Sequence, residues 1–93
     1  MITAIVNINC AVDRIPEVAQ AVADLPGVSE VYSVAGDVDL VAMVRVRRHE
    51  ELAEAIAGRI NKVDGILSTQ TLIAFQSYSR HDLEATFSLG IEP

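Results

Sequence analysis

The sequence is poor in cysteine, in basic residues and in long apolar runs, and each shortage excludes a class of protein. Cys10 is the only cysteine among 93 residues, which excludes a disulfide framework and a thiolate metal cluster. Seven basic against thirteen acidic residues leave a net charge of −6, which disfavours autonomous DNA binding because affinity for nucleic acid draws on Lys and Arg. No apolar run approaches the ~18 residues of a membrane span, and the N-terminus lacks the basic region of a signal peptide. We therefore expect a soluble protein of the cytoplasm.

The basic residues cluster at one place, Arg45, Arg47 and Arg48. A solvated strand end explains this cluster, and we favour that interpretation over a phosphate site. Aromatic residues are also scarce: the chain has two Tyr, two Phe and no Trp, although 51% of its residues are hydrophobic. Its core must therefore consist of Val, Ile, Leu and Ala. A chain this short buries only ~60–65% of its unfolded surface, so this much aliphatic material is a first indication of an oligomer.

Hydrophobic periodicity predicts six elements. Residues 2–10 alternate with a period of two, which is typical of a strand. A helix follows, with Asp13 placed to start it and Pro16 in its first turn; its apolar face comprises Ile15, Val18, Ala19, Val22 and Leu25. The stretches 28–34 and 38–46 predict two strands joined by a turn at Gly36. A second helix carries Leu52, Ile56, Ile60 and Val63 on one face, with Arg59 and Lys62 in its last turns. Residues 66–75 predict the fourth strand.

The order βαββαβ predicts an α+β fold of the ferredoxin-like kind, a four-stranded antiparallel sheet with both helices on one face. We expect this domain to span residues 1–77. Residues 78–93 are expected to be a C-terminal tail packed on the same domain, with a short helical turn around 82–86.

The sheet face opposite the helices should be polar in a monomer, but it carries Ile5, Val41 and Met43 together with residues of the fourth strand. Monomers seldom expose a contiguous apolar patch of a few hundred Å². The pattern therefore favours a dimer formed face to face through the sheet, over a sheet with scattered surface aliphatics.

Asp37 and Asp39 follow Gly36 in the turn between the second and third strands. If both residues are extended, their side chains point the same way and lie ~7 Å apart. Two interpretations remain open on chemistry alone. Asp is a common turn residue that bonds its own backbone, and two carboxylates covered by a second subunit would also favour an ammonium group between them.

The stretch "LPGVSEVYSVAGDVDLVAMVRV" within this order of elements resembles the effector domain of the Lrp/AsnC family, the feast/famine regulators of amino-acid metabolism. The matching positions are Pro26, Gly27, Val28, Gly36, Asp37, Asp39 and Leu40. The second helix and the Ser/Thr-rich fourth strand continue the match, which covers residues 2 to about 77. Full-length members carry an N-terminal helix-turn-helix, whereas this chain starts at the first strand. The resemblance therefore implies a stand-alone effector domain, also called a RAM domain, that does not bind DNA itself.

The resemblance also implies dimers of the α+β barrel type, which assemble further into rings, commonly of eight or ten subunits. An amino acid would bind between dimers, near the turn joining the second and third strands, and full-length relatives would be partners. By position, Gly36 would admit the ligand and Asp37 or Asp39 would take its α-ammonium group. Tyr32, Ser33 and Val34 would line the approach, and Thr69 and Thr71 would offer hydroxyl groups.

Two other functions remain as alternatives: an enzyme of the small monooxygenase type, which shares the fold, and a ligand-free module that co-assembles with regulators. The enzyme lacks clear candidates. His49 and His81 are the only histidines, at a helix start and in the tail, and Cys10 has no basic neighbour to lower its pKa. Metal-ligand spacings of the His-x₃-His or Cys-x₂-Cys kind and glycine-rich phosphate loops are absent. We expect no catalytic residues, no metal and no cofactor.

Overall fold

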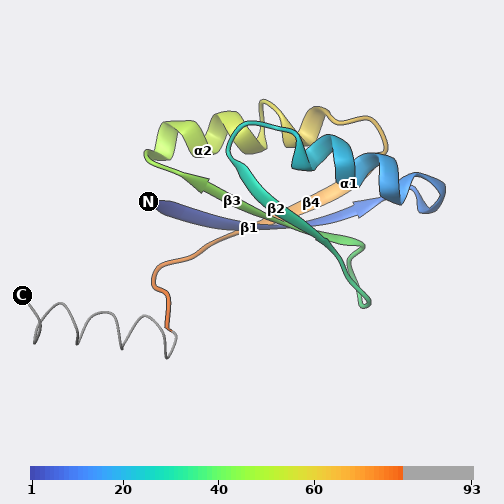
Figure 1. The fold of residues 1–93 in the computed structure, drawn as a ribbon, viewed down its shortest axis with the longest axis horizontal. Helices are drawn as coiled ribbons and strands as arrows, with labels where there is room; N and C mark the ends of the chain where they lie inside the picture. The colour runs from blue at the N-terminus through green and yellow to red at the C-terminus, as the bar shows by residue number, and fades with distance from the viewer. Residues whose placement is uncertain (79–93) are drawn as a thin grey trace, which may run out of the picture.

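The computed structural model describes residues 1–78, and its elements follow the predicted order βαββαβ (Figure 1). The strands are β1 (Ile2–Cys10), β2 (Val28–Ser33), β3 (Leu40–Val46) and β4 (Ile66–Ile73), and the helices are α1 (Ile15–Ala23) and α2 (His49–Ile56). Two 3-10 turns, η1 (Val12–Arg14) and η2 (Ile60–Lys62), flank the helices. The helical turn expected around residues 82–86 lies outside the described residues.

The four strands form one antiparallel sheet in the order β2-β3-β1-β4. β1 and β3 occupy the centre, where Ile8 lies opposite Leu40 and Ala4 opposite Val44. Both helices lie on the same side of the sheet (Figure 1), so the ferredoxin-like arrangement predicted from the sequence is confirmed. No helix among residues 1–78 is long and apolar enough to cross a membrane.

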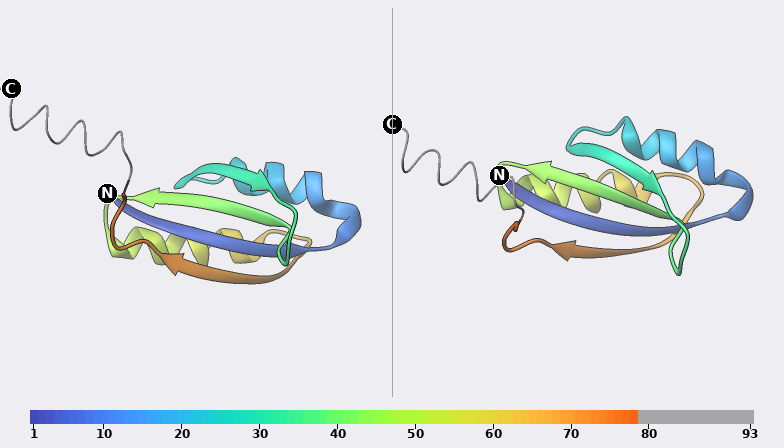
Figure 2. Two further views of the ribbon diagram at one scale, coloured as in Figure 1. Left: turned by 90° about the horizontal axis from the view of Figure 1, so that it is seen from below. Right: turned by 60° about the horizontal axis from the view of Figure 1, so that its bottom comes forward.

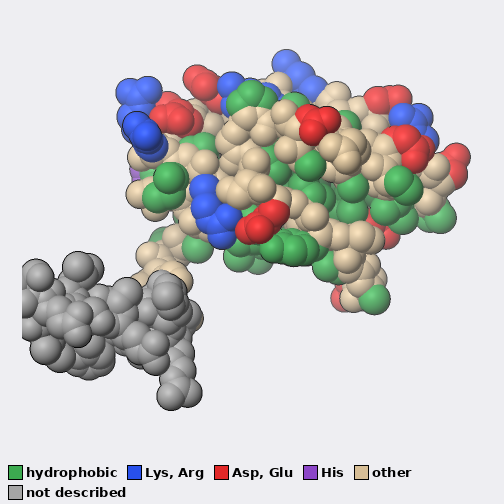
Figure 3. Space-filling model, viewed as in Figure 1, with side chains coloured by type: hydrophobic (Ala, Val, Ile, Leu, Met, Phe, Trp, Pro, Cys, Tyr) green, Lys and Arg blue, Asp and Glu red, His purple; other side chains and the backbone are tan. Residues whose placement is uncertain are grey.

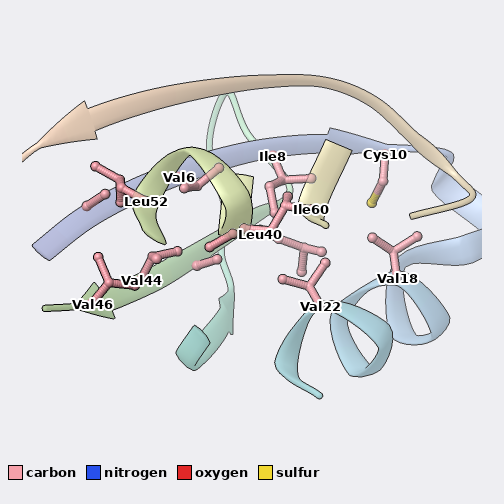
Figure 4. Packing of buried hydrophobic residues seen from close by; sticks show 13 residues of the cluster. Val6, Ile8, Cys10, Val18, Val22, Leu40, Val44, Val46, Leu52 and Ile60 are labelled. Atoms are coloured by element: carbon pink, nitrogen blue, oxygen red, sulfur yellow. The ribbon is translucent and has the colours of Figure 1, made fainter. Parts of the chain in front are cut away.

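The hydrophobic core fills the space between the helices and the sheet (Figure 4). Alternate residues of the two central strands supply its floor: Ala4, Val6, Ile8 and Cys10 from β1, and Leu40, Ala42, Val44 and Val46 from β3. Val18 and Val22 of α1, Leu52 and Ala55 of α2, and Ile60 of η2 cover them. No polar or charged residue among residues 1–78 is buried, so the core is held by aliphatic packing alone.

The first helix begins differently from the prediction. Asp13 does not start α1, because it lies in the 3-10 turn that precedes the helix, and no side chain caps either element. Pro16 does lie in the first turn of α1, where the missing N–H costs no hydrogen bond.

The second helix is shorter than predicted, and Arg59 and Lys62 lie beyond its end rather than in its last turns. A Cβ atom at Gly58 would lie 2.6 Å from the carbonyl oxygen of Glu54, so the chain passes closer to the helix end there than a side chain allows. The turn after Ile56 then delivers Ile60 into the core, where it is fully buried. The periodic apolar residues that predicted one long helix are therefore divided between α2, the turn that follows it and η2.

The sheet face away from the helices carries apolar side chains, as predicted. The strand register places Ile5, Met43 and Leu72 side by side on this face, with Val41 next to them on β3. Figure 3 shows hydrophobic side chains along the lower side of the molecule, opposite the helices. Leu72 is 47% exposed. Towards the C-terminal end of β1 the same face becomes polar, with Asn7, Asn9, Ser68 and Gln70, so the apolar surface covers only part of it.

Candidate functional site

The connection between β2 and β3 projects from the sheet on the side away from the helices (Figures 1 and 2). Both strands are shorter than predicted at this point, so residues 34–39 form an open loop rather than a tight turn at Gly36. One backbone hydrogen bond closes its base, from the Val34 N–H to the Asp39 carbonyl oxygen at 3.1 Å. Since loops carry binding groups on a rigid scaffold, this loop is a candidate binding site.

Gly36 lies at the exposed tip of the loop with φ +148°, a conformation that side chains disfavour. A Cβ atom built there would meet no atom within 4 Å. Glycine is therefore required by backbone conformation and not by packing within the chain. The space beside Gly36 is open to whatever approaches from outside.

The two aspartates of the loop have different surroundings. The Asp39 carboxylate turns back onto the sheet, where its Oδ2 accepts the Cys10 N–H at 3.0 Å, and its own N–H donates to the Ile8 carbonyl oxygen at 3.0 Å. Asp39 therefore joins the loop to the end of β1. Asp37 is exposed at the tip. Because the loop is not extended, the predicted parallel pair of carboxylates does not form, and only Asp37 faces outwards freely.

The residues expected to line the approach lie on different sides of β2. Tyr32 is 50% exposed on the face away from the helices, opposite Val41. Ser33 pairs with Leu40, on the helix side, and Val34 is 37% exposed at the start of the loop. Only Val34 thus borders the loop tip directly.

The Tyr32 hydroxyl donates a hydrogen bond to Glu30, whose Oε1 also accepts from the Arg45 guanidinium at 3.0 Å. The hydrogen bonds from Arg45 and then Tyr32 lower the pKa of Glu30, and the bond to Glu30 raises the pKa of Tyr32 above its ordinary 10.0. This polar group was not predicted from the sequence. Glu30 and Tyr32 are two residues apart on β2 and therefore lie on the same face, and Arg45 is two residues from Met43 on β3. This alternation was the signal in the sequence that could have predicted the group.

The two threonines lie on the helix side of β4. Thr69 pairs with Ile8 of β1, and its hydroxyl donates to the Asn61 side-chain oxygen at 2.9 Å. Thr71 borders a shallow apolar groove of about 340 Å³ between α2 and β4, together with His49, Leu52, Ala53, Ile56, Ala57 and Ile73. Because β1 separates β4 from β3, about 10 Å of sheet lies between the threonines and the loop strand. One subunit alone does not bring them to the loop.

The residues considered for catalysis remain dispersed. His49 is exposed at the first position of α2, and His81 lies outside the described residues. Cys10 is buried, and this burial, followed by the nearby Asp39 charge, raises the pKa of its thiol above the ordinary 9.0, which disfavours the thiolate nucleophile. Among residues 1–78, no group of three or more His, Cys, Asp or Glu could hold a metal ion.

The comparisons with known proteins agree on one family. The family model described as Lrp/AsnC ligand binding domain matches residues 3–83. An uncharacterised HTH-type transcriptional regulator of Pyrococcus horikoshii is 37% identical over 59 residues, which are 63% of this chain and 39% of that protein. The chain thus spans well under two thirds of the length of the curated relatives it matches.

Solved structures share the fold of this chain. A protein of Thermus thermophilus, TTHA0845, shares 45% identity with a TM-score of 0.80, over 86% of this chain and all of that one. A siroheme decarboxylase, NirDL, matches with a TM-score of 0.70 at 22% identity, over 81% of this chain and 26% of that one, and shows likeness of fold alone.

Proposed function

Because this chain belongs to the Lrp/AsnC ligand-binding domain family, we propose that it is an effector domain that binds an amino acid and modulates transcription through partner regulators. In this proposal two copies pair through the sheet face away from the helices, and the dimers assemble into a ring. The amino acid binds at the seams between subunits, against the loop between β2 and β3. The domain carries out no catalysis and does not bind DNA itself.

The loop tip is the observation that carries the ligand part of this proposal. Gly36 leaves open space at its Cβ position, and the Asp37 carboxylate is exposed beside it. A carboxylate pairs with the α-ammonium group that all amino acids share. Asp39 keeps a structural role, since its side chain already accepts the Cys10 N–H. We therefore assign the ammonium group to Asp37. Thr69 and Thr71 take part only if a neighbouring subunit presents them.

Two features of the charged residues support the absence of autonomous DNA binding. The chain is acidic overall, with a net charge of −6. Three of its arginines are already engaged, since Arg14, Arg45 and Arg48 form ion pairs with nearby carboxylates. The carboxylates beside these arginines would repel a phosphate backbone that approached them.

The ligand is tested by thermal unfolding of the full chain with each of the twenty amino acids. A true effector at one hundred times its Kd stabilises the native state by about 2.7 kcal/mol. Asp37→Asn should weaken that ligand at least tenfold without lowering the melting temperature of the unliganded protein. Asp13→Asn is the matched control, because Asp13 is also an exposed carboxylate but lies in η1, and it should retain full affinity.

Other outcomes would redirect the proposal. Equal ligand affinity in Asp37→Asn and wild type means that the ammonium group is bound elsewhere. No stabilisation by any amino acid supports the ligand-free co-assembly module, and turnover of a quinol or haem substrate supports the monooxygenase-type enzyme.

Pairing through the sheet is tested by sedimentation. Met43→Glu places a charge at the centre of the apolar surface and should reduce the mass to a single subunit of 10.0 kDa. Ala21→Glu adds the same charge at an exposed position of α1 and should leave the assembly intact. A dimer that survives Met43→Glu would place the interface on another surface.

A further inference from the structure

The shallow groove of about 340 Å³ between α2 and β4, the α2–β4 groove, lies on the helix side of the sheet. One wall is a face of α2, whose lining residues recur at the spacing of successive helical turns: His49, Leu52, Ala53, Ile56 and Ala57. Thr71 and Ile73 of β4 form the other wall. The groove is therefore separate from the sheet face through which two copies pair, and it stays accessible in that dimer.

The surface of this groove is apolar and partly uncovered. Ile73 is 49% exposed, and Ala53 and Ala57 are exposed on α2. Among the described residues that line the groove, none is Asp, Glu, Lys or Arg, although the chain holds thirteen acidic and seven basic residues. Such a surface suits an apolar group rather than a charged one.

The strand beside the groove is an edge of the sheet. Residues 66–73 of β4 include no charged residue and no proline, which are devices that usually keep an edge strand from pairing with other chains. The opposite edge strand, β2, carries Glu30 in an ion pair with Arg45. The two edges therefore differ, and the β4 edge is the one suited to contact with another subunit.

The groove and the loop between β2 and β3 lie at opposite ends of the subunit. In Figure 1 the loop extends at the lower right, whereas α2 begins at the upper left. The strand pairing agrees, since Asp39 of the loop bonds the Ile8 backbone near one end of β1, and Ile73 pairs with Ala4 near the other. A subunit therefore cannot place its own loop against its own groove. Contact between a loop and the groove of a neighbouring subunit is heterologous, and contacts of this kind generate rings.

The loop and the groove offer complementary parts of an amino-acid site. The loop tip presents the exposed Asp37 carboxylate to an ammonium group and leaves open space beside Gly36. The groove presents an apolar surface to a side chain. Thr71 and His49 in its lining have donors that suit the α-carboxylate, whereas the Thr69 hydroxyl already donates within the subunit. Together the two surfaces provide a group for each part of an amino acid.

We propose that the effector site is shared between two subunits and is selective for amino acids with an apolar side chain. The loop tip of one subunit holds the ammonium group, and the α2–β4 groove of a neighbouring subunit takes the side chain. This inference rests on the proposed function; it names the class of the ligand and the surface that completes the site.

The ligand class is tested by calorimetry with L-leucine and L-methionine against their polar counterparts of similar size, L-asparagine and L-glutamine. Each apolar amino acid should bind at least tenfold tighter than its counterpart, because the groove leaves a side-chain amide without enough hydrogen-bond partners. Asparagine or glutamine bound as tightly as leucine and methionine would overturn the inference.

The role of the groove is tested by filling it. Ala53→Leu adds an apolar side chain to the wall on α2 without a change of charge, and it should lower the affinity for leucine at least tenfold. Ala21→Leu is the matched control, since Ala21 is exposed on α1, and it should bind leucine as wild type does. Both variants place a strong helix former at an exposed helical position, so the unliganded proteins should stay folded. Equal leucine affinity in Ala53→Leu and wild type would contradict the proposal.

A mixing experiment tests whether the site is shared. Asp37→Asn keeps an intact groove and Ala53→Leu keeps an intact loop, so neither variant alone should bind leucine with wild-type affinity. When the two are mixed in urea and refolded together, random assembly places an intact loop against an intact groove at about one quarter of the seams. Calorimetry should recover tight binding at that stoichiometry. A mixture that binds no better than the separate variants would refute a shared site.

Failure of this inference is distinguishable from failure of the proposed function. If an amino acid binds the wild-type chain and loses affinity in Asp37→Asn but not in Ala53→Leu, the effector function holds and the shared site is refuted. If no amino acid binds the wild-type chain, both are refuted.

Discussion

Asp39 offers a quantitative test of how the loop between β2 and β3 is held. Its Oδ2 accepts the Cys10 N–H at 3.0 Å in a partly buried position, and its backbone bonds both Ile8 and Val34. Replacement by Ala removes only the side-chain bond. It leaves the Cys10 N–H at the end of β1 without its acceptor. The loop base should then loosen, while the core residues that define the fold stay in place.

The magnitude follows from the charge of the acceptor. Hydrogen bonds to charged groups contribute about 1.5–3 kcal/mol, and an unsatisfied buried donor costs about 1–3 kcal/mol. We expect Asp39→Ala to lower the free energy of unfolding by about 1.5–3 kcal/mol. For a domain of this size each kcal/mol lowers the melting temperature by about 4–8 °C. Asp39→Asn keeps an oxygen that can accept the bond and should lose about half as much.

The assay is urea unfolding at a fixed protein concentration, because any assembly makes apparent stability depend on concentration. Asp37→Ala is the comparison, since Asp37 is exposed at the loop tip, and it should stay within about 0.5 kcal/mol of wild type. Hydrogen exchange of the Cys10 amide should accelerate only in Asp39→Ala. If Asp39→Ala and Asp37→Ala unfold at the same urea concentration, the carboxylate does not hold the loop, and the different roles given to the two aspartates are refuted.

Three further predictions concern the rest of the chain. Gly65→Ala should lower the free energy of unfolding by about 1–3 kcal/mol, because φ is +100° at this position and the new Cβ would lie 2.8 Å from a methyl group of Val18 in α1. An unchanged midpoint of urea unfolding would contradict this prediction. Glu30→Gln should lower the pKa of Tyr32 towards 10.0, as seen by ultraviolet titration against wild type, since the hydrogen bond to Glu30 and then the Glu30 charge raise it. The stability from that bond is present below pH 10 and is lost as the pH rises through the raised pKa. Cys10 should react with a thiol reagent at about pH 8 only as fast as the chain unfolds, because its thiol is buried and its pKa is raised.

The sequence predicts the architecture well because local periodicity and burial agree in the central strands. Every second residue is buried from Ala4 onwards in β1 and throughout β3, and that alternation of apolar residues is visible in the sequence itself. Element ends are less predictable. The second helix ends at Ile56, and Gly58 then approaches the backbone of Glu54 more closely than a side chain allows, a contact that a periodic pattern does not encode. The expected strands likewise extended into residues 34–39, which form a loop.

The site is predictable only in part, for a related reason. Spacing along the chain locates Gly36 and Asp37 at a loop tip, since turn residues act locally. The role of Asp39 depends on Cys10, 29 positions away. Thr69 and Thr71 share a strand, but their side chains face the helix side because of the pairing of β4 with β1. The register is defined by the pairing of two strands, so the sequence of one strand alone does not determine which face its side chains occupy.

The different environments of the two aspartates explain how one loop can be both rigid and open. A binding loop that orders only on contact with its ligand loses affinity to that ordering. Here the base of the loop is tied to β1 by Asp39 through side chain and backbone, while the tip keeps Gly36 and Asp37 free of packing. A carboxylate held on such a base is positioned before a ligand arrives. Asp39→Ala should therefore lower the affinity for an amino acid bound at Asp37, even though Asp39 does not contact that ligand. Asp39→Asn should retain part of the affinity. Equal affinity in wild type and both variants would mean that the Asp39 hydrogen bonds contribute to stability alone.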